Sequence, residues 1–236
     1  MIPKIIHYCW FGGKAKPELA KKCIKSWKKF CPDWELREWN EANFPVSDYP
    51  YARYCLENGK WAFLSDFVRL VVVEEHGGVY LDTDVELLKP LDSLCEYDAY
   101  YGFEDERYVN TGLGFGAVAH HETVKAMKER YLALEPGEQG DFPLITCPQL
   151  NTKALKKLGL IKNGQRQSVA GAEILPSDYL SPYEYTTGRM RKTENTVSVH
   201  WYSKSWVSPA EKLRSKLTQP LHRIFGTDCF AWLKKK

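Results

Sequence analysis

Two aspartates, Asp82 and Asp84, stand two positions apart in an apolar, β-branched segment that follows Gly77-Gly78. Alternate residues of a strand point to the same face, so a strand over residues 79–87 would aim both carboxylates at one space. Two buried like charges repel unless a cation lies between them. Hard divalent cations take oxygen ligands. The segment therefore predicts a metal site, and the metal would in turn hold a phosphate-bearing substrate.

The chain of 236 residues is long enough for one domain with a sizeable core. No apolar run approaches the ~20 residues that a membrane-spanning helix needs. The first residues lack the apolar stretch and cleavage site of a signal peptide. The seven cysteines are scattered, odd in number and without a Cys-x-x-Cys pair, which favours reduced thiols. These features predict a cytoplasmic protein.

The formal net charge of +3 is unevenly distributed along the chain. From Lys204 to the end, eight basic residues face two acidic ones, while the preceding residues carry a net negative charge. We therefore expect a catalytic domain over residues 1–206 and a basic amphipathic segment over residues 207–236. The apolar residues of that segment fall on one helical face: Leu213, Leu217, Leu221, Ile224 and Phe225.

Such a basic amphipathic helix is typical of a segment that lies on anionic lipid, here on the inner face of the membrane. The alternative is a helix that packs on the body of the protein. The basic charge does not surround an element that could read bases, so we expect no nucleic-acid partner.

Helices alternate with strands in the first half of the chain. We expect helices over residues 17–31, 61–76, 121–134 and 149–158, and strands over residues 2–10, 34–39, 79–87, 99–103, 112–119 and 197–200. This alternation is typical of an α/β fold with a mostly parallel sheet. In such sheets ligands bind at the carboxyl ends of the strands, which is where the acidic pair lies.

The expected helix over residues 61–76 is apolar nearly all round, yet it carries Asp66 and Arg69. Residues three apart are neighbours on a helix, so the two charges can pair. They form either a buried ion pair that ties the helix to the sheet, or a pair that reaches into the cleft beside Asp82 and Asp84. In the second case the forked guanidinium of Arg69 could hold a sugar hydroxyl or a phosphate.

The run from residue 199 to residue 206 gathers His200, Lys204 and three aromatic side chains, Trp206 among them. A single histidine is often only a core residue, but His200 could also complete a metal shell with the two carboxylates. Lys204 could neutralise a leaving diphosphate. Trp10, at the end of the first expected strand, could stack on a nucleobase or belong to the core.

Three segments together resemble one known family: IPKIIHYCW at residues 2–10, SDFVR at 65–69 and GGVYLDTD at 77–84. They are similar to glycosyltransferase family 32, the sugar transferases with a DXD motif, which includes fungal mannosyltransferases and many bacterial capsular and lipopolysaccharide transferases. The resemblance implies a GT-A fold, a single Rossmann-like domain that binds nucleotide sugars.

The resemblance also implies a UDP- or GDP-sugar donor, Mn²⁺ or Mg²⁺ as cofactor, and retention of the anomeric configuration. The acceptor would be a glycan or a lipid-linked saccharide in surface polysaccharide synthesis. Two other functions remain open from the residues alone: a metal-dependent phosphohydrolase, and a non-catalytic carbohydrate-binding module.

The matched positions imply roles for individual residues. Trp10 would lie near the donor base, Asp66 and Arg69 at the donor sugar, and Tyr80 beside the ribose or diphosphate. Lys204 and Trp206 would complete the donor site.

The same resemblance implies a catalytic set of Asp82, Asp84 and Asn110, with Asn110 near the reacting sugar carbon. Asp84 would ligate the metal, and Asp82 would bind ribose, sugar or a metal-bound water. His200 is the third expected metal ligand, by similarity to GT-A enzymes in general.

Overall fold

The computed structural model of the chain describes residues 1–203 and 209–226, apart from the side chains of 209–213 and 215–217. Its main sheet follows the order β2-β1-β3-β7-β5-β9-β8, and β6 pairs with β5. These strands are β1 (Ile5–Cys9), β2 (Glu35–Trp39), β3 (Gly78–Tyr80), β5 (Ala99–Asp105), β6 (Tyr108–Val109), β7 (Phe115–Ala117), β8 (Gln167–Val169) and β9 (Ala172–Leu175).

Most strands along this path run in the same direction. β1 is parallel to β2 and β3, and β5 is parallel to β9, whereas β7 and β8 are antiparallel to their neighbours. The expected α/β fold with a mostly parallel sheet is therefore confirmed, with two reversed strands that make the sheet mixed.

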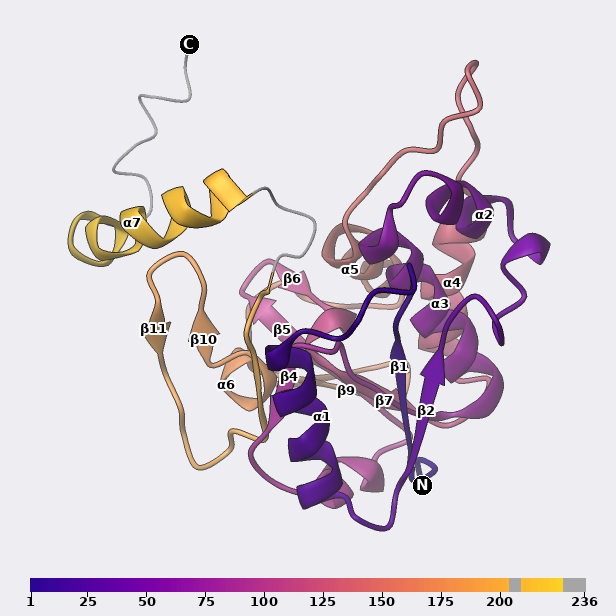
Figure 1. The fold of residues 1–236 in the computed structure, drawn as a ribbon. Helices are drawn as coiled ribbons and strands as arrows, with labels where there is room; N and C mark the ends of the chain where they lie inside the picture. The colour runs from indigo at the N-terminus through magenta and orange to yellow at the C-terminus, as the bar shows by residue number, and fades with distance from the viewer. Residues whose placement is uncertain (204–208, 227–236) are drawn as a thin grey trace.

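Helices cover both faces of the sheet (Figure 1). They are α1 (Glu18–Phe30), α2 (Pro50–Glu57), α3 (Trp61–His76), α4 (Glu122–Leu132), α5 (Cys147–Lys157), α6 (Ser177–Leu180) and α7 (Pro209–Phe225). The expected helices over residues 17–31, 61–76, 121–134 and 149–158 correspond to α1, α3, α4 and α5. Helix α5 begins two residues earlier than expected, because Pro148 occupies its first turn, where no backbone donor is needed.

Two hydrophobic cores result from the alternation of side chains along the strands. Tyr80 and Tyr101 pack into the core that also holds residues of α2, α3, α4 and α5. Val79 and Tyr100, one position away on the same strands, pack into the core on the other face, which includes Trp27 of α1. Period-two alternation thus buries both faces of the central strands.

The expected single strand over residues 79–87 is wrong. β3 ends at Tyr80, and β4 (Val85–Leu87) begins after a turn closed by the hydrogen bond from the Val85 N–H to the Asp82 carbonyl. β4 leaves the main sheet and pairs antiparallel with β12 (Ser198–His200). Asp82 and Asp84 consequently lie on a turn between two sheets. Their side-chain directions are set by this turn and not by the alternation of side chains along a strand.

Glycines at the end of α3 allow the chain to enter β3 beside His7. The backbone of Gly78 has φ +106°, and a Cβ there would lie 2.9 Å from His7 Nε2. His7 Nδ1 accepts a hydrogen bond from the Trp39 indole, so Nε2 carries the proton and donates to the Gly77 carbonyl at 2.8 Å. A buried neutral imidazole thereby joins β1, β2 and the start of β3.

Helix α7 contacts the hairpin of β10 (Tyr183–Glu184) and β11 (Arg189–Met190), which lies next to it in Figure 1. Gln219 donates to the Tyr185 carbonyl at 2.7 Å, and Arg189 donates to the carbonyl of Arg223 at 2.8 Å. Among the described residues, no helix has both the length and the apolar content to cross a membrane. The division of the chain at residue 206 stays a prediction.

Acid is expected to weaken the fold through His7. Burial lowers the pKa of His7 from 6.5 to about 4, although the Gly77 carbonyl opposes this shift. The unfolded chain binds the proton more readily, so the stabilisation is complete above pH 6.5 and is lost as the pH falls toward 4. Between pH 7 and pH 5 the free energy of unfolding should fall by about 2 kcal/mol more in the wild type than in His7→Gln.

Urea unfolding at the two pH values measures this difference. His120→Gln is the matched control, since the His120 side chain is 74% exposed and its variant should keep the wild-type pH dependence. Equal pH dependence of the wild type and His7→Gln would contradict the assignment.

Candidate functional site

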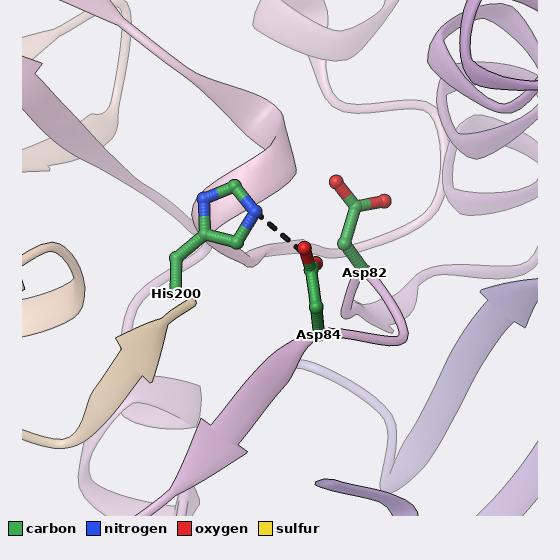
Figure 2. A group of neighbouring side chains, drawn as sticks. All are labelled: Asp82, Asp84 and His200. Carbon is green, nitrogen blue, oxygen red and sulfur yellow. Dashed lines mark ion pairs between the residues drawn. The ribbon is translucent and has the colours of Figure 1, made fainter. Parts of the chain in front are cut away.

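Asp82, Asp84 and His200 converge beyond the carboxyl end of β3 (Figure 2). Asp82 follows β3 by two residues, Asp84 directly precedes β4, and His200 is the last residue of β12. The antiparallel pairing sets His200 opposite Val85, next to Asp84. One ligand atom from each of the three residues lies within 4.8 Å of the other two.

Asp84 is held on both of its oxygens. Its Oδ1 lies 3.1 Å from His200 Nε2, and its Oδ2 accepts the Ser203 N–H at 2.7 Å. Burial alone would raise the pKa of Asp84, but the imidazole and the Ser203 N–H together hold it well below its usual value. Burial opposes the charged form of His200 as well, yet the facing carboxylate of Asp84 raises its pKa.

These three side chains fit a divalent cation. Two carboxylates and one imidazole are oxygen-rich ligands of the kind that Mn²⁺ and Mg²⁺ accept. Asp82 keeps an open side, with 24% of its side chain exposed. Its Oδ2 lies beside Gly112, where a Cβ would approach to 2.7 Å. Because Gly112 has no side chain, it leaves space beside the Asp82 carboxylate that the side chain of any other residue would occupy.

Arg69 connects helix α3 to the acidic turn. Its Nη2 lies 2.9 Å from Asp66 and 2.9 Å from Asp82 Oδ1, and only 3% of its side chain is exposed. The same Asp82 oxygen accepts the Tyr80 hydroxyl at 2.9 Å, and the guanidinium lies over the Tyr80 ring at 4.7 Å. The ion pair is therefore buried, and Arg69 also contacts Asp82; a role of the pair at the donor stays a prediction.

Burial affects the helix carboxylate and one turn carboxylate in the same direction. Burial raises the pKa of Asp66 to about 6, with the charge of Asp82 adding to the rise and Arg69 opposing it. Burial raises the pKa of Asp82 too, and Arg69 again opposes the rise. The side chain of Asp66 is 14% exposed and that of Asp82 is 24% exposed, so Asp82 is the more open of the two acids that share Arg69.

Asn110 is connected to the site by Gly112, which lies between the Asn110 amide and the Asp82 carboxylate. Its Oδ1 accepts the Gly112 N–H at 2.7 Å, and its amide donates to Glu104 Oε2 at 3.2 Å. The Cys147 thiol, at the start of α5, also donates to Asn110 Oδ1 at 3.2 Å. The amide is thus oriented by three partners, and its own side chain is buried.

Glu104 and Cys147 are absent from the residues expected from the sequence. Glu104 could have been found, since it is an acid at the carboxyl end of the expected strand at 99–103. Burial raises its pKa, although Asn110 donates to it. Cys147 has no comparable signal, and burial raises the pKa of its thiol too, which argues against a thiolate nucleophile.

The remaining expected site residues have different positions. Trp10 follows β1, its indole donates to the Lys14 carbonyl at 2.6 Å, and Lys16 lies over its ring at 5.5 Å. None of its described contacts joins it to Asp82, Asp84 or His200. Lys204 and Trp206 lie outside the described residues.

A further set of contacts ties helix α1 to β4, the partner of the strand that carries His200. Glu86 of β4 accepts hydrogen bonds from Lys22 at 2.8 Å and from the Trp201 indole at 2.9 Å. The Trp27 indole donates to the Val85 carbonyl at 2.8 Å. The short β4-β12 ladder is therefore fastened to α1 through β4, and Lys22 of α1 also lies 5.3 Å from the centre of the Trp201 ring, directly after β12.

Parts of this chain are similar in sequence or fold to known proteins. Residues 17–101 match the family described as glycosyltransferase sugar-binding region containing DXD motif, a stretch that includes Arg69 and the acidic turn. Inositol phosphoceramide mannosyltransferase 3 of Schizosaccharomyces pombe is 33% identical over 103 residues, which make up 42% of this chain and 29% of that protein. Lactosylceramide 4-alpha-galactosyltransferase of Pan troglodytes is 27% identical over 210 residues, or 80% of this chain and 55% of that protein.

The chain thus spans about half or less of the length of these two relatives. Among solved structures, the PaToxG glycosyltransferase superposes with a TM-score of 0.51 at 17% identity, over 66% of this chain and 69% of that one. This likeness concerns the fold, which is of the GT-A type. Residues 17–101 are therefore similar to the sugar-binding region, containing a DXD motif, of a family of glycosyltransferases.

Proposed function

We propose that this chain transfers a sugar from a UDP- or GDP-sugar to a hydroxyl of a glycan or lipid-linked acceptor. The observation that carries the proposal is the group of Asp82, Asp84 and His200 at the carboxyl end of β3, with ligand atoms within 4.8 Å of one another. The names of the two relatives support it, because both describe transfer of a hexose. We place the reaction in surface polysaccharide synthesis, in the cytoplasm.

The hard step of such a transfer is departure of the nucleoside diphosphate. Mn²⁺ or Mg²⁺, when bound by Asp82, Asp84 and His200, would offset the negative charge that builds on the leaving group. Arg69 and Tyr80 both hold Oδ1 of Asp82, which directs the second oxygen of that carboxylate into the site. These residues therefore orient the acid before any ligand arrives.

We infer that the sugar keeps its anomeric configuration by a front-face route. The bond from the anomeric carbon to the diphosphate oxygen breaks, the acceptor oxygen bonds to the same face, and the leaving diphosphate takes the acceptor's proton. The carboxylates of the site support this route: Asp66 and Asp82 are engaged by Arg69, and Asp84 by His200 and Ser203. Each of the three carboxylates is thus already paired with a cation or an N–H donor, which weakens it as a nucleophile.

The two other functions fit the geometry less well. A phosphohydrolase of the aspartyl-phosphate type needs one aspartate free to attack, whereas one oxygen of Asp82 and both oxygens of Asp84 have partners. A binding module would use aromatic faces and has no need of a buried Arg69 between two acids.

A panel of nucleotide sugars tests the proposal. The full chain with Mn²⁺ should release UDP or GDP from one donor and label a glycan or lipid-linked acceptor. Release of inorganic phosphate from simple esters, without turnover of any nucleotide sugar, would instead identify a phosphohydrolase. Failure to bind UDP or GDP in the presence of Mn²⁺ would reject the proposal.

Replacing Asp84 tests the metal site. In Asp84→Asn the amide keeps the size of the side chain but loses the charge that a cation needs, so Mn²⁺-dependent UDP or GDP binding and transfer should both fall at least ~100-fold. Titration calorimetry and the transfer assay measure the loss, and circular dichroism checks the fold. Asp141→Asn, an exposed acid elsewhere, should behave as the wild type; unchanged turnover in Asp84→Asn would refute the assignment.

Replacing Arg69 tests the support of the acidic turn. Arg69→Gln leaves the carboxylates of Asp66 and Asp82 facing each other without a cation, which should lower the free energy of unfolding by about 3–5 kcal/mol. Adding Asp66→Asn removes one of these charges and should restore part of the stability but not the transfer. Urea unfolding and the transfer assay separate the two effects.

The control for this pair is Arg53→Gln, which removes an exposed arginine on α2 and should change neither quantity. Full activity in the double variant Asp66→Asn/Arg69→Gln would show that Arg69 is needed for stability alone.

We also propose that α7 contacts the anionic inner face of a membrane, near a lipid-linked acceptor. Ile224 and Phe225 are 72% and 69% exposed, beside the exposed Arg223. Ile224→Glu/Phe225→Glu should therefore reduce co-flotation of the full chain with liposomes that contain acidic lipid. Ile161→Glu, which changes a 65% exposed residue elsewhere, is the control; equal flotation of all three proteins would end the idea.

A further inference from the structure

A cavity of about 450 Å³ lies between α4, α5 and β6, and it contains no residue of the Asp82, Asp84 and His200 group. Its volume falls within the range of about 300–1,000 Å³ that is usual for small-molecule sites. Four cationic side chains line it: Arg130 of α4, Lys153 and Lys156 of α5, and Lys162.

No carboxylate lines this cavity, so no acidic residue of the cavity wall neutralises the positive charge of these four side chains. Within residues 1–203 and 209–226, none of the four cations forms an ion pair. The Nε of Arg130 is buried and has no hydrogen-bond partner among the described residues. A buried donor on a cation is costly when it is unpaired, so this nitrogen calls for an anionic acceptor.

Besides the four cations, the cavity is lined by apolar and aromatic side chains and by the polar residues Gln149 and Thr152. Leu134, Ile145 and Leu150 line the cavity, and the Tyr108 ring stands under Lys162, whose Nζ is 5.6 Å from its centre. Lysine and arginine are the usual partners of phosphate oxygens, and the leucines and isoleucine offer nothing to a fully hydrated anion. A ligand that fills the cavity thus has an anionic end and an apolar part.

We infer that this cavity is a second ligand site, which binds a phosphate or diphosphate group joined to an apolar chain or ring. One wall of the cavity adjoins the segment that carries Asn110. Thr152 of α5 accepts the N–H of Val109, the residue before Asn110, at 2.9 Å, and Cys147 at the start of α5 contacts Asn110 itself. The inference needs no sugar transfer, so its failure would leave the proposed function untouched.

Calorimetric titration of the full chain, in EDTA to keep divalent cations away from the ligands, tests the inference with two probes. Geranyl diphosphate carries an apolar chain, and inorganic pyrophosphate does not. Lys153→Gln/Lys156→Gln should weaken binding of geranyl diphosphate about tenfold or more, since two charged contacts are lost. Lys125→Gln/Lys157→Gln removes the same amount of charge, one lysine from α4 and one from α5, outside the cavity and should bind as the wild type.

The two probes also separate the possible sources of the phosphate. Tighter binding of geranyl diphosphate than of pyrophosphate identifies a phosphate ligand with an apolar part and supports the inference, whereas equal binding identifies a free phosphate compound and overturns the apolar part of the inference. Asp84→Asn should bind both probes as the wild type does. The inference is overturned if neither probe binds, if the two lysine double variants weaken binding equally, or if Asp84→Asn abolishes it.

Discussion

Arg69 brings one nitrogen within 2.9 Å of the carboxylates of both Asp66 and Asp82, in a helix that is otherwise packed against the core. The cost of burying its charge is offset by these two acids and by the Tyr80 ring beneath the guanidinium. Asp82 in turn depends on Arg69. The turn after β3 places the Asp82 carboxylate close to that of Asp84, and the guanidinium offsets the negative charge of the pair. The position of α3 against the sheet and the geometry of the site thus rest on the same contact.

Charge in the site is balanced in two separate places. Arg69 compensates Asp66 and Asp82, whereas His200 and the Ser203 N–H compensate Asp84. A metal takes the neutral imidazole, so the raised pKa of His200 sets up a competition between a proton and a cation for the same nitrogen. The carboxylates of Asp82 and Asp84, with Arg69 shared between Asp82 and Asp66, leave the site negative when His200 is neutral, which favours the cation.

Much of this arrangement could be predicted from local patterns. Three of its features are visible in short stretches of sequence: the apolar run of α3 with its two charges, the glycines that follow α3, and the two acids two residues apart. Helix α3 has the predicted bounds. The break between β3 and β4 could not be predicted, because the β-branched residues on both sides of the turn are equally compatible with one strand. Only the pairing of β4 with β12, residues more than a hundred positions away, ends β3 at Tyr80.

The residues that sequence reasoning missed share this dependence on distant parts of the chain. Cys147 becomes part of the site because α5 packs beside β6, and Glu104 because β5 lies two strands from β3 in the main sheet. Glu104 at least stands at the carboxyl end of an expected strand, whereas Cys147 has no comparable signal in the sequence. A local sequence pattern can thus indicate that a residue belongs to the site, whereas the residues that it contacts there are determined by tertiary packing.

The fastening of the β4-β12 ladder to α1 has a consequence for transplanting this site into another protein. Asp82 takes its position from the main sheet, while Asp84 and His200 take theirs from a small ladder that Lys22, Trp27 and Trp201 hold against α1. A graft of the Asp82-Thr83-Asp84 turn alone would carry two acids without their third partner or the spacing between them. The smallest portable unit is the turn together with α1, α3 and β12.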